Sequence, residues 1–284
     1  MSSGPSLSWT DAALGGAQEL PHARGGAATA SWSYASQDVL FIFGGCSEVT
    51  CYDDLQRHDQ HSGRWAVQQA QGKPPLRRKG HSLTLLGPAW AQQLIVFGGW
   101  GGDGPVPNSL KAFTLSTSSW DVVPLGGTPP SARWAHTATA VSESRMLVIG
   151  GEGVLGGQYF NDVHSFSLDD QSWARVHPRG DGASGRLLPT ARMGHSSTLI
   201  GDALLVFGGY TTEQRGSRSI RVATNELWVR QPHVTQEPTP TRERHLLAVR
   251  PSVPSPFLQP PCIPARTLFS HVSIRLCTPP PPIS

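Results

Sequence analysis

Several residues of this chain have types and spacings that could support chemistry. Arginine is followed after two residues by histidine in "RKGH" at 78–81, "RWAH" at 133–136 and "RMGH" at 192–195, and histidine is a common metal ligand and proton-transfer group. Asp54 and His58 lie four residues apart, and His61 follows three residues later. Carboxylates and imidazoles at such spacing raise the question of a metal site.

A catalytic group normally occurs once in a domain, whereas these histidines recur at one repeat position. We therefore expect His81, His136 and His195 to pack or to hydrogen bond within their repeats rather than to ligate or catalyse. His58 and His61 are spaced like a metal pair on a helix, but the residues around them predict a strand and a turn. A solvated loop is the favoured interpretation of that segment.

Cysteine content and hydrophobicity bound the class of protein. No apolar run approaches the roughly 20 residues that span a bilayer, and the first residues, "MSSGPSLSWTDAALGG", are interrupted by Ser, Gly and Pro. We expect a soluble intracellular protein in the cytoplasm, with the nucleus left open and no membrane partner. A reduced compartment is expected because the cysteines lack both the density of a disulfide scaffold and the paired spacing of a zinc site. They are Cys46, Cys51, Cys262 and Cys277.

The elements that must position these residues repeat along the chain. Four apolar segments run into a glycine pair, in "LFIFGGC", "LIVFGGW", "MLVIGGE" and "LLVFGGY", and the pairs at 44, 98, 150 and 208 are 54, 52 and 58 residues apart. After each pair an acidic or amide signal precedes an aliphatic residue, in "DDL", "NSL", "NDV" and "NEL". Ten residues beyond the first three aliphatics stand Trp65, Trp120 and Trp173. Four markers in a fixed order indicate an internal repeat.

Each repeat unit is expected to form four short strands. In the third unit "HTATAVS" alternates between apolar and polar residues, "RMLVIGG" is continuously apolar, "DVHSFSLD" alternates again and "SWARV" follows. Period-two alternation and short apolar runs between turn-forming residues predict strands.

A four-stranded repeat of about this length, with a double glycine and a late tryptophan, resembles the kelch repeat, one blade of a β-propeller. The resemblance covers about residues 9–229 and implies an all-β, kelch-type propeller with about four four-stranded blades. The tryptophans are then expected to pack between neighbouring blades. Because glycine has no Cβ, the chain can turn sharply at the strand end and neighbouring backbone can approach closely, so alanine there should clash or strain.

Composition divides the chain near residue 230. Before Arg230 there are 17 basic and 18 acidic side chains, and from Arg230 onward there are six basic and two acidic ones. All 31 glycines lie at or before Gly216, whereas 13 of the 25 prolines follow Arg230. We expect a propeller region over 1–229 and a Pro-rich, glycine-free, disordered tail over 230–284.

The way the ring closes is left open by the sequence. The position ten residues past Leu227 is Glu237, so the fourth blade lacks its tryptophan strand. Trp9, in "LSWTDA" at 7–12, stands fifteen residues before Arg24, which is close to the thirteen between Trp65 and Arg78. An N-terminal strand could therefore complete the last blade and remove exposed sheet edges. An open arc or truncated ring is the alternative, because four repeats are few for kelch proteins.

Some propellers of similar pattern are enzymes. The galactose oxidase-like proteins bind copper through two tyrosines and two histidines, and no matching constellation is found. The nitrile-specifier proteins are similar to this sequence, and their metal motif is matched by Asp54 and His58, while Thr50 stands where its first acidic ligand belongs. No metal or other cofactor is expected, and a specifier-like metal enzyme is the alternative.

The favoured function is a non-enzymatic protein–protein interaction module, a scaffold or adaptor, that binds its partner through loops on one propeller face. A substrate-recognition subunit of a ubiquitin ligase is a further alternative, although no BTB or F-box segment is evident. The lone basic run "LRRKG" at 76–80, on a body with a charge of −1, predicts no nucleic-acid partner.

In propellers of this family, ligands commonly meet the residue after the glycine pair and the arginine region before the first strand. The first position varies between blades, as expected of partner-specifying residues, and Trp, Tyr and Arg dominate interface energetics. The arginine position keeps one residue type, which also suggests a structural part. The predicted partner-binding residues are Cys46, Trp100, Glu152, Tyr210, Arg78, Arg133 and Arg192.

Overall fold

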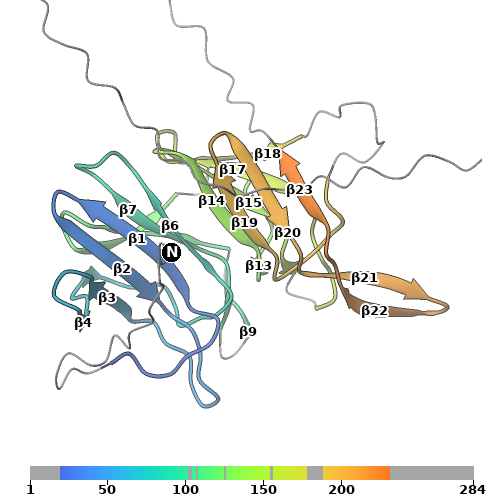
Figure 1. Ribbon diagram of the computed structural model, residues 1–284, viewed down its shortest axis with the longest axis horizontal. Helices are drawn as coiled ribbons and strands as arrows, with labels where there is room; N and C mark the ends of the chain where they lie inside the picture. Colours follow the sequence, from blue (N-terminus) through green and yellow to red (C-terminus); the bar gives the residue numbers. More distant parts are fainter. Residues whose placement is uncertain are drawn as a thin grey trace, which may run out of the picture. The chain divides into compact units, whose positions relative to one another are not determined.

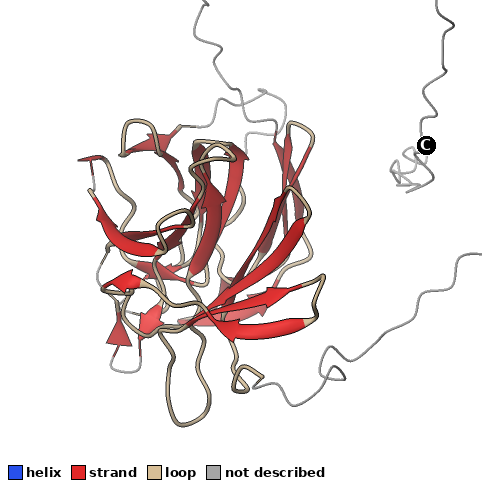
Figure 2. Cartoon of the chain, turned by 90° about the vertical axis from the view of Figure 1, so that its left-hand side faces the viewer, coloured by secondary structure: helices blue, strands red, loops and turns tan. Residues whose placement is uncertain are grey.

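The computed structural model describes residues 20–230, apart from 102–103, 107, 125, 154–155 and 178–187. This described part consists of strands and loops and contains no helix that could cross a membrane (Figure 2). The chain divides into two units, Met1–Val234 and Thr235–Ser284. All elements below belong to the first unit. The predicted disordered tail, apart from Arg230, and the N-terminal segment around Trp9 lie outside the described residues.

The first blade is an antiparallel sheet of four strands in chain order (Figure 1). Residues 39–43 of its second strand are all apolar, and their burial alternates, with Val39, Phe41 and Phe43 buried on the face toward the second blade. The strands are β1 (Ala28–Tyr34), β2 (Gln37–Phe43), β3 (Leu55–Asp59) and β4 (Arg64–Val67).

The second and third blades repeat this sheet and each gain a fifth, parallel strand of two residues. The added strands come from the linkers "QGKPP" and "GGTPP", which leave one blade and run beside the outer strand of the next. Blade 2 contains β5 (Gln71–Gly72), β6 (Ser82–Leu86), β7 (Gln93–Phe97), β10 (Leu110–Thr114) and β11 (Ser119–Val123). Blade 3 contains β12 (Gly126–Gly127), β14 (Thr137–Ser142), β15 (Arg145–Ile149), β17 (Val163–Ser167) and β18 (Ser172–Val176).

The fourth blade has three strands among the described residues, in the order β19, β20, β23. A separate hairpin, β21–β22, fills the interval between its glycine pair and "NEL". The fourth-strand position near Glu237 lies outside the described residues. These elements are β19 (Ser196–Ile200), β20 (Ala203–Phe207), β21 (Tyr210–Arg215), β22 (Arg218–Ala223) and β23 (Leu227–Arg230).

These four sheets are the blades of a β-propeller, which confirms the predicted all-β fold. Two short ladders complete the described strands: β8 (Trp100–Gly101) with β9 (Gly104–Pro105), and β13 (Arg133–Trp134) with β16 (Glu152–Gly153).

The hydrophobic core lies between consecutive blades. The Trp120 ring is 5.4 Å from Phe43 of the preceding blade and 5.1 Å from Phe113 of its own. Trp173 packs in the same way, 5.1 Å from Phe97 of the preceding blade. Both tryptophans are almost fully buried, so their predicted packing between blades is confirmed. Trp65 is half-buried on blade 1, and its ring lies 4.7 Å from that of His58.

The glycine pairs are required by contacts with two blades. A Cβ on Gly98 would lie 2.6 Å from His136 Cε1 of the next blade, and one on Gly99 would lie 2.9 Å from His81 of its own. Both glycines also have positive φ, 65° and 109°, a conformation that residues with a Cβ rarely adopt. The predicted clash and strain of alanine at these positions are thus both explained.

Histidines of the Arg-x-x-His segments are buried at the blade junctions. His136 Nε2 lies 3.0 Å from Ser82 Oγ of blade 2, and His195 Nε2 lies 3.0 Å from Thr137 Oγ1 of blade 3. The prediction of a structural role is confirmed, but the two hydrogen bonds run between blades rather than within one. The bonds cross between blades because the innermost strands of consecutive blades lie side by side. The sequence of a single repeat does not show this arrangement.

Candidate functional site at the glycine-pair ends of the strands

One backbone arrangement occurs four times where the glycine-pair strands end. The residue after each glycine pair bridges to the residue that follows the arginine of the same blade. Three of the bridges thus present two side chains at the same edge of their blade, and the bridge of blade 1, which contains a glycine, presents one. The bridged pairs are Cys46 with Gly25, Trp100 with Lys79, Glu152 with Trp134 and Tyr210 with Met193, and we call these eight residues the glycine-pair face.

The arginines lie beneath this face. Arg78, Arg133 and Arg192 have at most 1% of their surface exposed. Each donates from Nη1 to the carbonyl of the first glycine of its own blade's pair, over 2.8–3.0 Å. These three side chains were predicted to contact a partner, but the structure buries them, because each guanidinium points inward to the backbone of its own blade. Their hydrogen bonds fix the backbone that carries the face.

Three of the four arginines also pair with an acidic residue. Arg24 binds Asp54, Arg133 binds Asp162 and Arg192 binds Glu226. These acids come from the "DDL", "NDV" and "NEL" signals, whose function the sequence did not reveal. Burial alone would raise the pKa of the Asp162 carboxyl, but hydrogen bonds from His164 and Arg133 outweigh it and hold that pKa well below its usual range.

In blade 2 the equivalent of the acid is Ser109, in "NSL". Within the described residues Arg78 forms no ion pair, and its guanidinium is held by the carbonyls of Leu76 and Gly98. Burial lowers the pKa of Arg78 to about 10. This blade therefore has a serine at the position where its neighbours place the carboxylate that pairs with the arginine.

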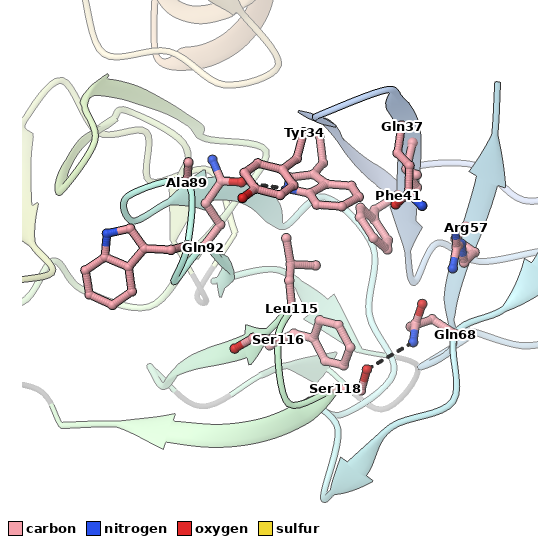
Figure 3. Close-up of a pocket in the computed structure, with 14 residues that line it drawn as sticks. Tyr34, Gln37, Phe41, Arg57, Gln68, Ala89, Gln92, Leu115, Ser116 and Ser118 are labelled. Carbon is pink, nitrogen blue, oxygen red and sulfur yellow. Dashed lines mark hydrogen bonds between the residues drawn. The ribbon is translucent and has the colours of Figure 1, made fainter. Parts of the chain in front are cut away.

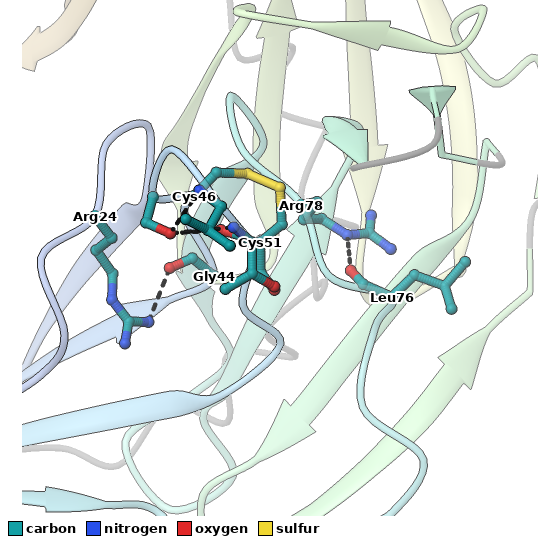
Figure 4. Close-up of a disulfide and its surroundings, with 9 residues drawn as sticks. Arg24, Gly44, Cys46, Cys51, Leu76 and Arg78 are labelled. Carbon is teal, nitrogen blue, oxygen red and sulfur yellow. Dashed lines mark hydrogen bonds between the residues drawn. A yellow bond between two sulfur atoms is a disulfide. The ribbon is translucent and has the colours of Figure 1, made fainter.

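Cys46 is joined to Cys51 by a disulfide (Figure 4). The intervening loop turns tightly, because Ser47 N donates to Thr50 O and Tyr52 N donates to Gly45 O, which leaves the two Cα atoms 3.9 Å apart. The cysteine spacing showed no disulfide framework and a reduced compartment was expected, so this bond was not predicted. Sequence spacing alone did not show that the strand end folds back so sharply. Cys46 is half-buried and presents a bonded sulfur, not a thiol, to the face.

The remaining predicted residues differ in accessibility. Tyr210 is the most exposed, at 46%, and begins the hairpin β21 rather than a loop. Trp100 is half-buried, with its ring 6.0 Å from that of Trp134 of the next blade. Glu152 is only 4% exposed. The face thus combines an exposed phenol, a pair of tilted indoles and a carboxylate at its floor.

Sequence reasoning missed one half of this face, which is formed by the residues that directly follow the arginines. Lys79 is exposed and Trp134 is half-buried, whereas Met193 is buried. Their position one residue after a repeat marker was the available signal. Like the residues after the glycine pairs, they differ from blade to blade on the same backbone.

The structure also separates the residues of the alternative metal motif. The Asp54 carboxylate is engaged by Arg24 and by Gln56 Nε2. His58 lies in β3 against the Trp65 ring, and His61 lies exposed in the following turn. Four residues along an extended strand span about 13 Å, so Asp54 and His58 do not share a coordination sphere. Among the described residues, no group of three or more His, Cys, Asp and Glu side chains is placed to hold a metal ion.

A hollow of about 440 Å³ lies between blades 1 and 2, at the strand ends opposite the glycine-pair face (Figure 3). Trp32 and Tyr34 stack on one wall, 6.1 Å apart, and Trp32 Nε1 donates to Gln92 Oε1. Trp90, on the connection from β6 to β7, is 78% exposed. This hollow was not predicted from the sequence, because Trp32, Tyr34 and Trp90 belong to no repeated motif.

The fold and the repeated face define the class of protein, a β-propeller built from glycine-pair and Arg-x-x-His repeats. The chain matches the KLHDC2/KLHL20/DRC7 Kelch-repeats domain over residues 5–187 and 87–253. It is 27% identical over 250 residues to Kelch domain-containing protein 3 of Rattus norvegicus, which covers 80% of this chain and 60% of the relative.

Two other relatives match only in a small part of their own length. Acyl-CoA-binding domain-containing protein 5 of Arabidopsis thaliana is 31% identical over 162 residues, 57% of this chain and 23% of that protein. Host cell factor 1 of Homo sapiens is 29% identical over 211 residues, 66% of this chain and 10% of that protein. The chain therefore spans less than two thirds of these relatives. It belongs to the kelch-repeat family, and this membership favours an interaction module over an enzyme.

Proposed function

We propose that the chain is a non-enzymatic protein–protein interaction module that binds its partner on the glycine-pair face. The observation that carries this proposal is the repeated bridge: one backbone geometry holds different side chains in each blade. This arrangement suits recognition of a partner. The arginines hold the backbone in the same conformation in each blade, while the bridged residues differ and can provide specificity.

The chemistry of the face fits a polypeptide partner. Trp100, Trp134 and Tyr210 supply large, rigid aromatic surfaces, the residue types that dominate binding energy in protein interfaces. Lys79 adds an exposed cation and Glu152 a buried anion. The face therefore offers both large apolar side chains and charged groups, as protein interfaces do.

The test is quantitative capture of partners by the wild-type chain and by the double variant Trp100→Ala, Tyr210→Ala, followed by affinity measurement with the purified partner. Binding is expected to weaken by at least about tenfold, or 1.4 kcal/mol. The melting temperature should change little, because neither side chain belongs to the cores between blades.

Two further variants make the result decisive. Val122→Ala removes an exposed apolar side chain on β11 and should leave binding unchanged. Trp90→Ala probes the hollow between blades 1 and 2. If Trp90→Ala abolishes binding while the double variant binds normally, the partner site is the hollow and the proposal fails.

A further inference from the structure

A buried carboxylate on the glycine-pair face has one oxygen that finds no hydrogen-bond partner among the described residues. Glu152 Oε1 accepts a 2.8 Å hydrogen bond from the Gly157 amide. Oε2 is buried and accepts no hydrogen bond from the described residues. A buried, unsatisfied carboxylate oxygen is costly, so its retention calls for a physical reason.

One cation approaches this oxygen without binding it closely. Arg221 Nη2, from β22 of the neighbouring blade, is 3.6 Å from Glu152 Oε2, beyond the range of a normal hydrogen bond. Arg221 is held away by Tyr159, whose hydroxyl accepts from Nε over 2.6 Å. Its side chain is 52% exposed, so solvent competes for the guanidinium.

Two phenol rings flank the same guanidinium. The Arg221 Cζ atom lies 5.8 Å from the Tyr159 ring centroid and 5.9 Å from that of Tyr210, distances at which a cation is attracted to an aromatic ring. Two kinds of group near Arg221 therefore attract a planar cation: the two phenol rings and the Glu152 carboxylate. Arg221 lies close enough to interact with both rings, but it does not form a hydrogen bond with the carboxylate.

We propose that Glu152, Tyr159 and Tyr210 form a binding site for an arginine side chain of a partner polypeptide, and that Arg221 is a displaceable stand-in for it. The incoming guanidinium donates to Glu152 Oε2 between the two rings, and Arg221 turns outward into solvent. This inference rests on the proposed function and specifies the chemistry of the partner.

Arginine fits this site better than lysine does. A guanidinium presents a rigid fork of donors to a carboxylate and stacks on aromatic faces, whereas an ammonium is a compact and more strongly hydrated charge. The hairpin β21–β22, which carries Arg221 and Tyr210, also explains why the site occurs only once among the described blades. The other blades have no described hairpin of this length at the equivalent interval.

The test uses the full chain labelled with ¹⁵N and the probe Nα-acetyl-arginine N-methylamide, with the citrulline analogue as its neutral isostere. We expect a saturable shift of the Gly157 amide resonance, because that amide donates to the same carboxylate. The citrulline analogue should cause no such shift, and the lysine analogue should bind more weakly.

Three variants separate the contributions. Glu152→Gln keeps an acceptor for Gly157 but removes the charge, and should weaken binding of the arginine probe at least about tenfold. Arg221→Ala removes the stand-in and should tighten binding by about threefold to tenfold, because a larger fraction of the chain is then competent. Glu213→Gln, on an exposed carboxylate of the same hairpin, should change nothing.

Equal shifts with the arginine and citrulline probes, or unchanged probe affinity in Glu152→Gln, would overturn the site. Melting curves show whether Glu152→Gln is folded, and Arg221→Ala gives an independent answer if it is not. Loss of partner binding in Trp100→Ala, Tyr210→Ala without any effect of Glu152→Gln would refute this inference and leave the proposed function standing.

Discussion

The imidazole of His136 lies 3.0 Å from the hydroxyl of Ser82, across the junction between blades 2 and 3. Burial first, and then the charge of Arg133, lower the pKa of His136 well below 6.5. The same causes lower the pKa of His81 to about 3 and that of His195 to about 4, with Arg78 and Arg192 as the neighbouring charges. The three junction histidines are therefore neutral in the folded chain at physiological pH.

We predict that the fold loses stability as the pH falls below about 6.5. The folded pKa values lie below the unfolded one, so unfolding takes up protons, and the stability present above pH 6.5 is lost toward pH 4. Each histidine contributes a slope of up to about 1.4 kcal/mol per pH unit in that window. Urea unfolding at several pH values measures this. In His136→Gln the slope should be shallower, and an unchanged slope would contradict the assignment.

Residue 135 provides a prediction about backbone strain. Ala135 has a φ of 51°, at the position where the other blades carry Gly26, Gly80 and Gly194. Alanine pays about 1–2 kcal/mol in this conformation, and part of that is offset by its lower unfolded-state entropy. We expect Ala135→Gly to stabilise the fold by about 0.5 kcal/mol in denaturant titrations.

The reverse change is the matched control. A Cβ on Gly80 would lie 3.1 Å from Trp134 Cε3 and 3.4 Å from Ala135 N. Gly80→Ala should therefore destabilise the fold by about 1–2 kcal/mol. If both substitutions shift stability in the same direction, backbone conformation is not the cause.

The buried Arg78 offers a way to stabilise the second blade. Ser109 holds the position of Asp54 and Asp162, each directly before its strand's first aliphatic residue. Ser109→Asp should place a carboxylate near Arg78, raise its pKa from about 10 and add about 1 kcal/mol at pH 7. Ser109→Asn, which has the same shape without the charge, should not. Equal melting temperatures of the two variants would show that no ion pair forms.

The fourth blade supports a prediction about the chain's N-terminus. On the face of blade 4 that points away from blade 3, Phe207, Leu227 and Val229 are 51–60% exposed. Their counterparts in blade 2, Phe97 and Leu110, are fully buried. If residues 7–12 complete this blade, removing residues 1–12 should lower the melting temperature by roughly 5–10 °C, since a buried strand with a Trp is lost.

A shorter deletion, of residues 1–6, is the control because it retains Trp9. The point variant Trp9→Ala should reproduce most of the effect of the long deletion. Melting curves that coincide for the wild type and both deletions would count against closure by this segment.

The repeat markers predicted the blades well because each reports a local requirement. The glycine pairs reflect positive φ and a close neighbour, and the tryptophans of blades 2 and 3 fill the junction with the preceding blade. Tertiary pairings were harder to predict. Arg133 was predicted to bind a partner, yet its guanidinium is bound by the carboxylate of Asp162, 29 residues away, and by the carbonyl of Gly150.

The candidate site was predictable only in outline. Trp100 and Tyr210 were identified from their places after the glycine pairs, but Tyr159 and Arg221 belong to insertions that the repeat does not describe. The disulfide was missed for a similar reason, because the loop between Cys46 and Cys51 is specific to blade 1. Features that occur in one blade alone cannot be recognised from the repeat pattern, and in this chain they shape the candidate site.

A row of backbone hydrogen bonds crosses the blades two residues after each arginine. Gly80 N donates to Gly26 O, Ala135 N to Gly80 O and Gly194 N to Ala135 O, over 2.7–2.8 Å. In this row, blades 2 and 3 each donate one bond to the preceding blade and accept one from the following blade. Tandem duplication of a DNA segment encoding one blade would thus add a donor and an acceptor together, without side-chain coevolution. The number of blades in such a chain can change in evolution while each new junction keeps its backbone hydrogen bond.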